Sequence, residues 1–308
     1  MPSNQTPLGA LPARFRRERI LMVGCGDVGQ RAASVLHPRT RLLALTSSAE
    51  RVASLRAQGI TPLLGNLDAP ATLQRLAGIA TRVLHLAPPP SEGWADPRTQ
   101  ALVRALRRRS HPASLVYAST SGVYGDCEGD WVDETRASHP DTPRARRRVF
   151  AERSVRFLGR SAGIRTSILR IPGIYAPDRE GGTPRARLLK GTPVLQEQDD
   201  VYTNHIHADD LARACVLAVW RARPQRVYNI NDDTRLKMGD YFDLAADLYQ
   251  LPRPPRVARE GARAQLPVML LSFMGESRRM VNTRMKKELG LRLRFATVAQ
   301  GLMERPAP

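Results

Sequence analysis

Cysteine, lysine and aromatic residues are scarce in this sequence, and it contains no long hydrophobic run. The three cysteines, Cys25, Cys127 and Cys215, show no paired spacing, so we expect no disulfide framework and a reducing, cytoplasmic location. The apolar runs Ile20 to Val23 and Val83 to Ala87 have the length of a strand and fall far short of a membrane span. These absences argue against a secreted disulfide-rich domain and against a membrane-spanning protein.

The charge is strongly of one sign. A formal net charge of +19 raises the hypothesis of nucleic-acid binding. However, the basic residues are spread along the whole chain, and aromatic residues, which stack on bases, make up only 5% of it. We therefore expect a solvated basic surface that attracts small anionic ligands. We do not expect a nucleic-acid partner, because charge alone does not read a base sequence.

Short apolar stretches alternate with amphipathic ones along the chain. The strands that we predict are 19–23, 41–46, 60–64, 82–87, 114–118, 166–171 and 228–231. The predicted helices are 30–36, 49–58, 70–77, 99–108, 143–160, 208–220, 238–249 and 282–289. This alternation predicts an α/β fold with a doubly wound parallel sheet of six or seven strands, helices on both faces, and a smaller C-terminal lobe over the carboxyl ends of the strands.

A glycine motif, Gly24-Cys-Gly26-Asp-Val-Gly29, lies directly after the first predicted strand and directly before a predicted helix. Gly24 allows a tight turn, Gly26 lets the backbone approach a pyrophosphate, and Gly29 lets helix and strand pack closely. The phosphates would meet unpaired amides at the positive end of the helix dipole. In this context the motif predicts a Rossmann-type NAD(P) site, with Asp27 and Val28 included, rather than a glycine-rich turn without a ligand.

The end of the second predicted strand carries hydroxyl groups where NAD-binding proteins place an acid for the ribose. The residues there are Thr46, Ser47 and Ser48, with Glu50 and Arg51 shortly after them. Hydroxyl groups and a nearby arginine suit a 2′-phosphate, so Thr46, Ser47 and Arg51 predict NADP as the cofactor. NAD stays possible, since Glu50 could reach back to the ribose.

We expect three parts in the chain. Residues 1–17, with several prolines, form a loose leader. Residues 18–180 form the NAD(P)-binding Rossmann domain. Residues 181–308 form a smaller mixed substrate lobe that is interleaved with it, and 207–231 rejoin the Rossmann domain.

Five further segments occur in a fixed order. They are Gly65-Asn-Leu-Asp68, Leu84-His-Leu-Ala87, Tyr117-Ala-Ser-Thr-Ser-Gly-Val-Tyr-Gly125, Leu169-Arg-Ile-Pro-Gly-Ile-Tyr175 and Asn204-His-Ile-His-Ala-Asp-Asp-Leu211. With them, the chain from about Ile20 to Leu302 resembles the extended short-chain dehydrogenase/reductase superfamily, in its NAD-dependent epimerase/dehydratase branch and among the atypical members. The resemblance implies an NAD(P)-binding protein similar to an epimerase, a dehydratase or a carbonyl reductase.

The resemblance also implies roles for single residues. On the cofactor side, Asn66 and Leu67 would lie beside the adenine, Leu86 and Ala87 would line the dinucleotide cleft, and Pro172 and Gly173 would face the nicotinamide amide. Thr120 matches the hydroxyl residue that hydrogen-bonds the reacting oxygen. Tyr124, Asn204 and His207 would lie on the substrate side.

The family's catalytic Tyr-x-x-x-Lys pair is missing. Arg144 and Arg148 stand at those places on the predicted helix 143–160. Arginine holds its proton near neutral pH and cannot replace a phenol as proton donor. The two residues share a helix face at i and i+4, so they could clamp a phosphate or carboxylate of an anionic substrate. Equally, they could be two more arginines on an arginine-rich helix.

Other candidates are weaker. His205 and His207 flank Ile206 and share a face, but two histidines without a third ligand do not predict a metal site. Asp209 and Asp210 are expected to cap the helix that follows them. Two functions stay open: an NAD(P)-dependent enzyme with an altered proton donor, and a non-catalytic dinucleotide-binding sensor or scaffold. A homodimer is one of the assemblies that the sequence leaves open.

Overall fold

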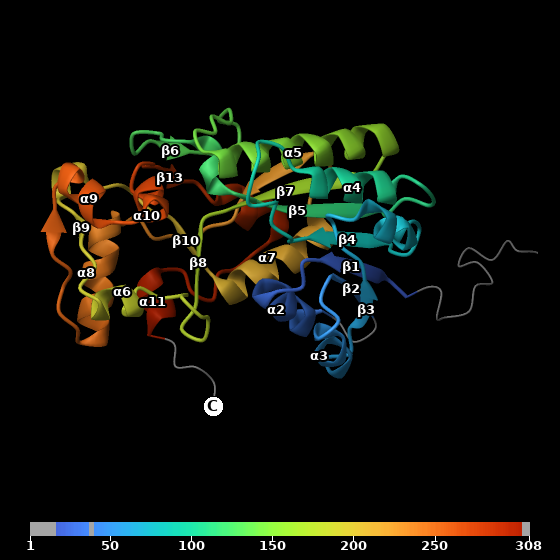
Figure 1. The fold of residues 1–308 in the computed structure, drawn as a ribbon, viewed down its shortest axis with the longest axis horizontal. Helices are drawn as coiled ribbons and strands as arrows, with labels where there is room; N and C mark the ends of the chain where they lie inside the picture. Colours follow the sequence, from blue (N-terminus) through green and yellow to red (C-terminus); the bar gives the residue numbers. More distant parts are fainter. Residues whose placement is uncertain (1–16, 37–39, 304–308) are drawn as a thin grey trace, which may run out of the picture.

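A seven-stranded parallel sheet forms the centre of the computed structural model, which describes residues 17–36 and 40–303. The strand order is β11-β7-β5-β4-β1-β2-β3 (Figure 1). The strands are β1 (Arg19–Val23), β2 (Arg41–Thr46), β3 (Thr61–Leu64), β4 (Arg82–His85), β5 (Ser114–Thr120), β7 (Arg165–Ile171) and β11 (Arg226–Asn229). The order runs outward in opposite directions from β1 and β4, so the crevice of a doubly wound sheet lies at their carboxyl ends. The predicted doubly wound parallel sheet is confirmed.

Alternating residues of each strand feed two separate cores. In β1, Ile20 and Met22 pack with helices α2 (Asp27–Val35) and α7 (Ala208–Arg221) on one face. Leu21 and Val23 face the other side and pack with α4 (Pro97–Leu106) and α5 (Pro143–Ala162). A buried parallel strand needs apolar residues on both faces, which explains the continuous hydrophobic run of β1. Helix α3 (Arg51–Ala57) adds Leu55 to the first core.

Side-chain caps fix where α4 and α5 begin. Asp96 accepts a hydrogen bond from the Thr99 amide at 3.0 Å, and Pro97 follows it as the first helical residue. Helix α4 therefore begins two residues before the predicted start at 99. Thr142 caps α5 in the same way through the Ala145 amide, and Gly163, in the left-handed conformation, ends that helix.

A smaller C-terminal lobe lies beyond the carboxyl ends of the central strands (Figure 1). Its own apolar core includes Leu188, Val194, Tyr241 and Phe242. The elements that build it are α6 (Arg185–Leu189), β9 (Val194–Leu195), α8 (Met238–Tyr249), β12 (Arg256–Val257), α9 (Arg259–Gln265), α10 (Val268–Phe273) and α11 (Val298–Leu302). Two short parallel pairs lie between sheet and lobe: β8 (Gly173–Tyr175) with β10 (His205–His207), and β6 (Trp131–Val132) with β13 (Arg279–Met280).

Two predicted helices take tighter or wider turns than expected. The segment predicted as a helix over 70–77 is the 3₁₀ helix Pro70–Leu76. The predicted helix 282–289 begins at residue 283, and its Met285–Leu289 part is a π helix. Apolar spacing alone does not separate these geometries over so few turns. The predicted leader falls almost entirely on residues 1–16, outside the described residues. Within the segment 207–231, α7 packs against the central sheet and β11 is one of its strands.

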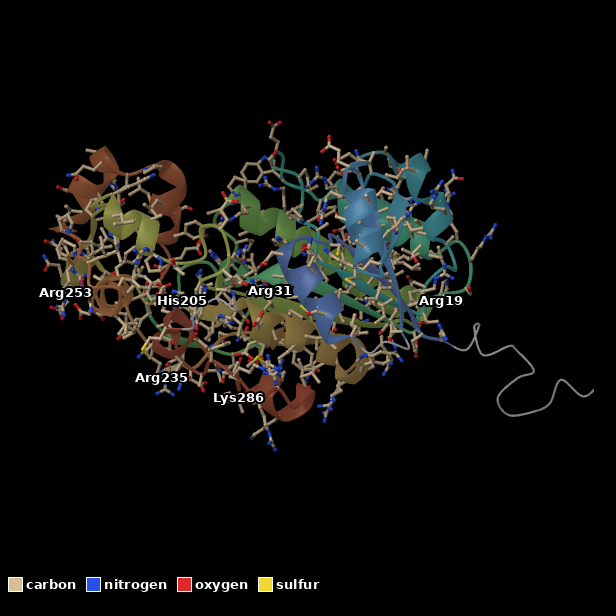
Figure 2. All side chains as sticks on the ribbon, turned by 90° about the horizontal axis from the view of Figure 1, so that it is seen from below. Arg19, Arg31, His205, Arg235, Arg253 and Lys286 are labelled. Carbon is tan, nitrogen blue, oxygen red and sulfur yellow. The ribbon has the colours of Figure 1, made fainter. Side chains whose placement is uncertain are left out.

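The basic side chains are distributed widely. Arg19, Arg31, Arg235, Arg253 and Lys286 are spread from one end of the molecule to the other (Figure 2). Several have acidic partners, such as Arg253 with Asp247 at 2.7 Å. Among the described residues, no helix is long and apolar enough to cross a membrane.

A buried ion pair joins three elements of the sheet domain. Arg170 of β7 donates to Glu152 of α5 at 2.9 Å, both side chains are about 5% exposed or less, and Ser119 of β5 donates to the same carboxylate at 2.6 Å. Removing one member leaves the other charge buried without a partner. We expect Glu152→Ala to lower the free energy of unfolding by about 3–5 kcal/mol in urea titrations. The exposed neighbour change Arg153→Ala is the control, and a Glu152→Ala loss no greater than that of the control would contradict this role.

Candidate functional site

Gly24 sits where two strands of the switch point meet. It follows β1 with φ of +94°, and a Cβ atom there would lie 2.7 Å from the Ala87 Cα and 2.9 Å from the Leu86 carbonyl carbon. The amides of Leu86 and Ala87 both donate to the Val23 carbonyl, at 2.7 and 2.8 Å. Only glycine combines this backbone conformation with this close approach. The end of β1 is thereby fixed against the segment that follows β4.

The N-terminus of α2 is open. Gly26 is its N-cap residue, and because glycine has no side chain, it cannot cap the first amides of the helix. A Cβ atom added to Gly26 would have no atom of the described residues within 4 Å, whereas one added to Gly29 would lie 3.1 Å from the Gly24 carbonyl oxygen. The first amides of α2 therefore face free space beside a tightly packed turn. This arrangement fits the pyrophosphate of a dinucleotide, with the anion at the positive end of a nine-residue helix.

The end of β2 is near this turn. The Thr46 hydroxyl is already used, because it donates to the Ser48 carbonyl and accepts from the Ser48 amide, both at 3.3 Å. Ser47 is exposed. Arg51 reaches the glycine loop (residues 24–29) and donates from Nη2 to the Cys25 carbonyl at 2.5 Å. Arg51 therefore lies at the edge of the glycine loop, and it forms no bond to a carboxylate of the described residues.

The segment after β3 closes an Asx turn. The Asn66 side-chain oxygen accepts from the Asp68 amide at 3.0 Å, and the Asn66 amide donates to Thr72 at 2.9 Å. Leu67 is half-buried against the second core. Asp68 pairs with Arg98 of α4 at 2.6 Å, and this pairing lowers the pKa of the Asp68 carboxyl. These bonds fix the loop to α4.

Arg31 connects α2 with two distant segments. Its guanidinium bonds Asp27 of the same helix at 2.9 Å, Asp209 of α7 at 2.6 Å, and Asp178 of the loop after β8 at 2.7 Å. Burial alone would lower the pKa of Arg31, but the bonds to the three carboxylates raise it above its usual range. Arg179, next to Asp178, places Nη1 3.7 Å from Asp27.

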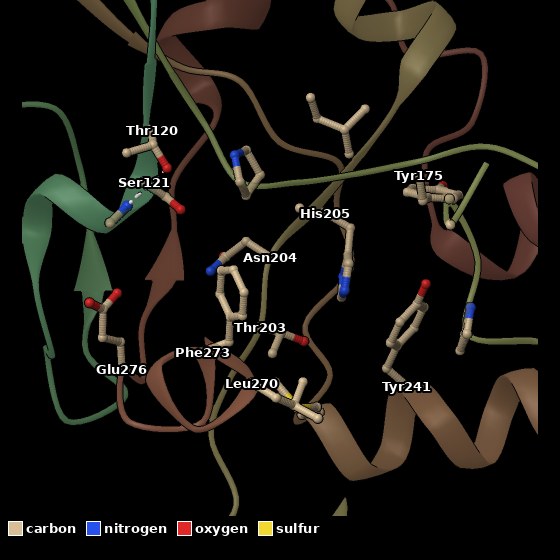
Figure 3. Close-up of a pocket in the computed structure, with 18 of the residues that line it drawn as sticks. Thr120, Ser121, Tyr175, Thr203, Asn204, His205, Tyr241, Leu270, Phe273 and Glu276 are labelled. Carbon is tan, nitrogen blue, oxygen red and sulfur yellow. Dashed lines mark hydrogen bonds between the residues drawn. The ribbon is translucent and has the colours of Figure 1, made fainter. Parts of the chain in front are cut away.

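A pocket of about 650 Å³ lies between the carboxyl ends of the sheet and the C-terminal lobe. Six of the predicted site residues line it: Thr120, Arg144, Arg148, Pro172, Gly173 and Asn204. Thr120 and Ser121 stand on one side, while His205 and Tyr241 stand on the other (Figure 3). Residues from β5, α5, β8, α6, α8 and α10 therefore converge on one cavity.

The pocket is strongly cationic. Its described lining residues include five arginines and a single acidic residue, Glu276, which is paired with Arg278. Arg148 donates to the Ala118 carbonyl at 2.7 Å and to the Tyr117 hydroxyl at 3.2 Å, and Arg144 stacks on Phe273 at 4.5 Å. Burial lowers the pKa of Arg144 from its usual value, although Glu276 opposes the shift. A cation that has lost water without gaining a close acidic partner favours an anionic ligand.

Three further residues line the pocket that no sequence pattern had marked as pocket residues: Arg187, Tyr241 and His205. Arg187 stacks on Phe242 at 4.2 Å, and its Nε and Nη2 atoms are buried with no hydrogen-bond partner among the described residues. His205 packs its ring 4.2 Å from that of Tyr241. Burial lowers the pKa of His205 to about 4, so its ring is neutral at pH 7.

Two residues predicted on the substrate side lie outside the pocket lining. Tyr124 is buried, its hydroxyl donates to Asn229 at 2.7 Å, and burial raises its pKa. His207 is fully buried and caps α7, where Nδ1 accepts from the Asp209 amide at 3.3 Å. The prediction that Asp209 and Asp210 cap this helix is therefore wrong, because the histidine before them supplies the cap.

Asp210 does not cap α7 but binds a distant segment of the backbone. Its carboxylate accepts from the amides of Arg294 and Phe295 at 2.9 Å, which fixes the chain that leads to α11.

Asn204 lines the pocket but is also bonded within the protein. Its side-chain nitrogen donates to the Arg278 carbonyl, and its side-chain oxygen accepts from the Met280 backbone amide. Among the described residues, no group of three or more histidine, cysteine or acidic side chains could hold a metal ion.

Comparisons with known proteins agree with this architecture. A family model described as the NAD dependent epimerase/dehydratase family matches residues 20–231. A functionally unknown conserved protein from Silicibacter pomeroyi DSS is 31% identical, with 92% of this chain and 96% of that chain covered and a TM-score of 0.77. No curated protein matches the chain.

Two further solved structures share the fold at lower identity. UDP-glucose 4-epimerase from Thermotoga maritima, solved with UDP-glucose, is 18% identical, with 92% of this chain and 96% of that chain covered and a TM-score of 0.74. UDP-glucuronic acid 4-epimerase from Bacillus cereus, solved with NAD, is 17% identical with the same coverage and a TM-score of 0.73. The family model spans more than half of the chain, which confirms the resemblance found in the sequence. The protein belongs to the NAD-dependent epimerase/dehydratase family.

Proposed function

We propose that the protein binds a nicotinamide dinucleotide in the crevice between β1 and β4 and a small anionic molecule in the adjoining arginine-lined pocket. The observation that carries the proposal is the open N-terminus of α2, where Gly26 leaves room for the pyrophosphate. Solved relatives in fold contain NAD or a UDP-sugar, which is consistent with both halves of the proposal. The contacts that we propose for the dinucleotide are Gly24, Gly26, Asp27, Val28, Gly29, Thr46, Ser47, Arg51, Asn66, Leu67, Leu86, Ala87, Pro172 and Gly173.

The preferred cofactor in this proposal is NADP. Ser47 is exposed and Arg51 lies against the glycine loop, so a hydroxyl and a cation are available to a 2′-phosphate. Glu50, the acid nearest to them in sequence, precedes α3 and makes no side-chain cap bond with a described residue. These residues support a phosphate-bearing ribose better than a bare one.

Thr120, Arg144 and Arg148 are the residues that we propose to act on the substrate. A bound nicotinamide supplies hydride acceptance or donation. The Thr120 hydroxyl lies at the carboxyl end of β5, where it can hydrogen-bond a substrate oxygen. Arg144 and Arg148 replace the family's tyrosine and lysine and can hold a carboxylate or phosphate, but they cannot deliver a proton. The proton donor of an enzyme with this pocket must therefore differ from the usual phenol.

A non-catalytic dinucleotide binder is the second candidate. The observation in its favour is that Tyr117 and Tyr124, the tyrosines that flank Thr120 in sequence, have hydroxyls engaged by Arg148 and Asn229. Incubation with NADPH and a panel of carbonyl compounds distinguishes the two functions. Turnover of the cofactor supports the enzyme, and tight binding without turnover supports the sensor or scaffold.

We expect Gly26→Val to abolish dinucleotide binding while the protein stays folded. The new side chain would fill the space in front of α2, yet it would meet no described atom of the protein within 4 Å of its Cβ. Calorimetry with NADP and a thermal melt check the two halves. Gly24→Ala is the contrasting variant, because it clashes with Ala87 and lowers stability. Unchanged NADP affinity in folded Gly26→Val would refute the site.

NADP should bind more tightly than NAD, and Arg51→Ala should remove most of the difference. A hydrogen bond to a charged group contributes about 1.5–3 kcal/mol, so the variant should lose roughly tenfold to a hundredfold in NADP affinity and little in NAD affinity. Paired titrations of both cofactors measure this. A clear preference of the unmodified protein for NAD would show that an acid reaches the ribose.

The double variant Arg144→Ala, Arg148→Ala should weaken an anionic ligand far more than the dinucleotide. With UDP-glucuronic acid as the probe, the loss of two charged contacts corresponds to about a hundredfold or more. Arg153→Ala, Arg160→Ala, on exposed positions of the same helix, controls for net charge. Thr120→Val tests the remaining hydroxyl. If neither change alters ligand binding or cofactor turnover relative to the control, the enzyme hypothesis fails and the binder remains.

A further inference from the structure

We propose that Arg179 is a direct ligand of the dinucleotide pyrophosphate and reaches it from the wall of the substrate pocket. The inference rests on the proposed dinucleotide site at the N-terminus of α2. It concerns a residue that lies outside the glycine loop, about 150 positions later in the chain, and that the sequence patterns do not indicate.

The loop that carries Arg179 has a fixed shape. It connects β8 with α6, and two hydrogen bonds close it: the Arg179 amide donates to the Ala176 carbonyl at 3.2 Å, and the Gly182 amide donates to the Arg179 carbonyl at 2.9 Å. A Cβ atom on Gly182 would lie 2.8 Å from the Arg179 Cβ, so this turn is compact. The direction in which Arg179 leaves the loop is therefore set by the backbone.

The same loop is attached to the cofactor helix. Asp178 bonds Arg31 at 2.7 Å, and Arg31 bonds Asp27 of α2 at 2.9 Å. Asp27 is the first residue of α2 and directly follows Gly26. These two bonds hold the Arg179 side chain at the turn whose free amides face the proposed pyrophosphate position.

Arg179 has an unused donor at this point. Its Nη1 atom is buried and has no hydrogen-bond partner among the described residues, and Asp27 Oδ2, at 3.7 Å, is too far for a hydrogen bond. Arg31 binds the other oxygen of this carboxylate, Oδ1, at 2.9 Å, so Arg179 Nη1 has a distant ion-pair partner in Oδ2 and, among the described residues, no acceptor at hydrogen-bond distance. A buried guanidinium N–H without an acceptor is costly, and a phosphate oxygen would supply the acceptor.

Arg179 also lines the substrate pocket, together with Gly181, Gly182 and Thr183 of the same loop. One side chain thus borders both ligand sites. A dinucleotide that bonds Arg179 would hold this wall of the pocket in place before the anionic substrate enters.

The test is calorimetric titration of the full chain and its Arg179→Ala variant with NADP, ADP-ribose and 2′-AMP. ADP-ribose carries a pyrophosphate, whereas 2′-AMP presents the adenosine and the 2′-phosphate without one. We expect Arg179→Ala to weaken NADP and ADP-ribose by about tenfold to a hundredfold and to leave 2′-AMP within about twofold. Arg179→Lys, which keeps the charge, should recover part of the loss. Arg185→Ala, an exposed arginine in α6, is the matched control for net charge.

The outcomes separate this inference from the function on which it rests. If the unmodified protein binds none of the three probes, the dinucleotide site itself is wrong. If it binds NADP and Arg179→Ala behaves like Arg185→Ala, the site stands and the role of Arg179 is overturned. An equal loss for 2′-AMP, or a lowered melting temperature that Arg179→Lys does not restore, would show that Arg179 supports the fold instead of touching the pyrophosphate.

Discussion

The contact between Gly24 and the backbone of Ala87 is the constraint on which the site depends. At this point the strand order reverses, and the chain leaving β1 must pass within van der Waals distance of the chain leaving β4. A side chain on Gly24 would push the two apart. Because the contact is made, α2 starts close to the sheet, and its first amides open into the crevice. Gly29 continues the same packing on the helix side.

A second set of interactions extends that constraint to the C-terminal lobe. Arg31 joins α2, α7 and the loop after β8 through three carboxylates, and the loop then continues into the wall of the pocket. An arginine with three acidic partners is held more firmly than one in a single exposed ion pair, which contributes little by itself. The basic composition of the chain thus has a structural side, since arginines connect elements, and a ligand-binding side, since the pocket arginines have few acidic partners.

Local patterns predicted the parts of the site that depend on neighbours in sequence. The spacing of Gly24, Gly26 and Gly29 after a buried strand identified the glycine loop, whereas Thr120 and Pro172, which line the pocket, were marked by the family resemblance. Period-two alternation could not separate His205 from His207, because both belong to β10 and share a face. The difference arises one residue later, where α7 begins and uses His207 as its cap.

Contacts between residues far apart in the chain could not be predicted from the sequence. Arg31 bonds residues 147 and 178 positions away, and no periodicity connects them. Arg179 and Arg187 were hidden for the same reason, since the path of the loop between β8 and α6 depends on the packing of the lobe. Arg144 and Arg148 were found only because the resemblance marked their positions among many arginines of one helix. The structure places both in the pocket. Helix periodicity alone would equally allow them to be ordinary surface arginines.

A crystal structure of the protein with NADP tests the central claim most directly. The account predicts the pyrophosphate within hydrogen-bond distance of the first amides of α2, beside Gly26, with the nicotinamide directed toward Pro172, Gly173 and Thr120. A dinucleotide bound with its phosphates among Arg144, Arg148 and Arg187, and with the N-terminus of α2 free, would contradict it.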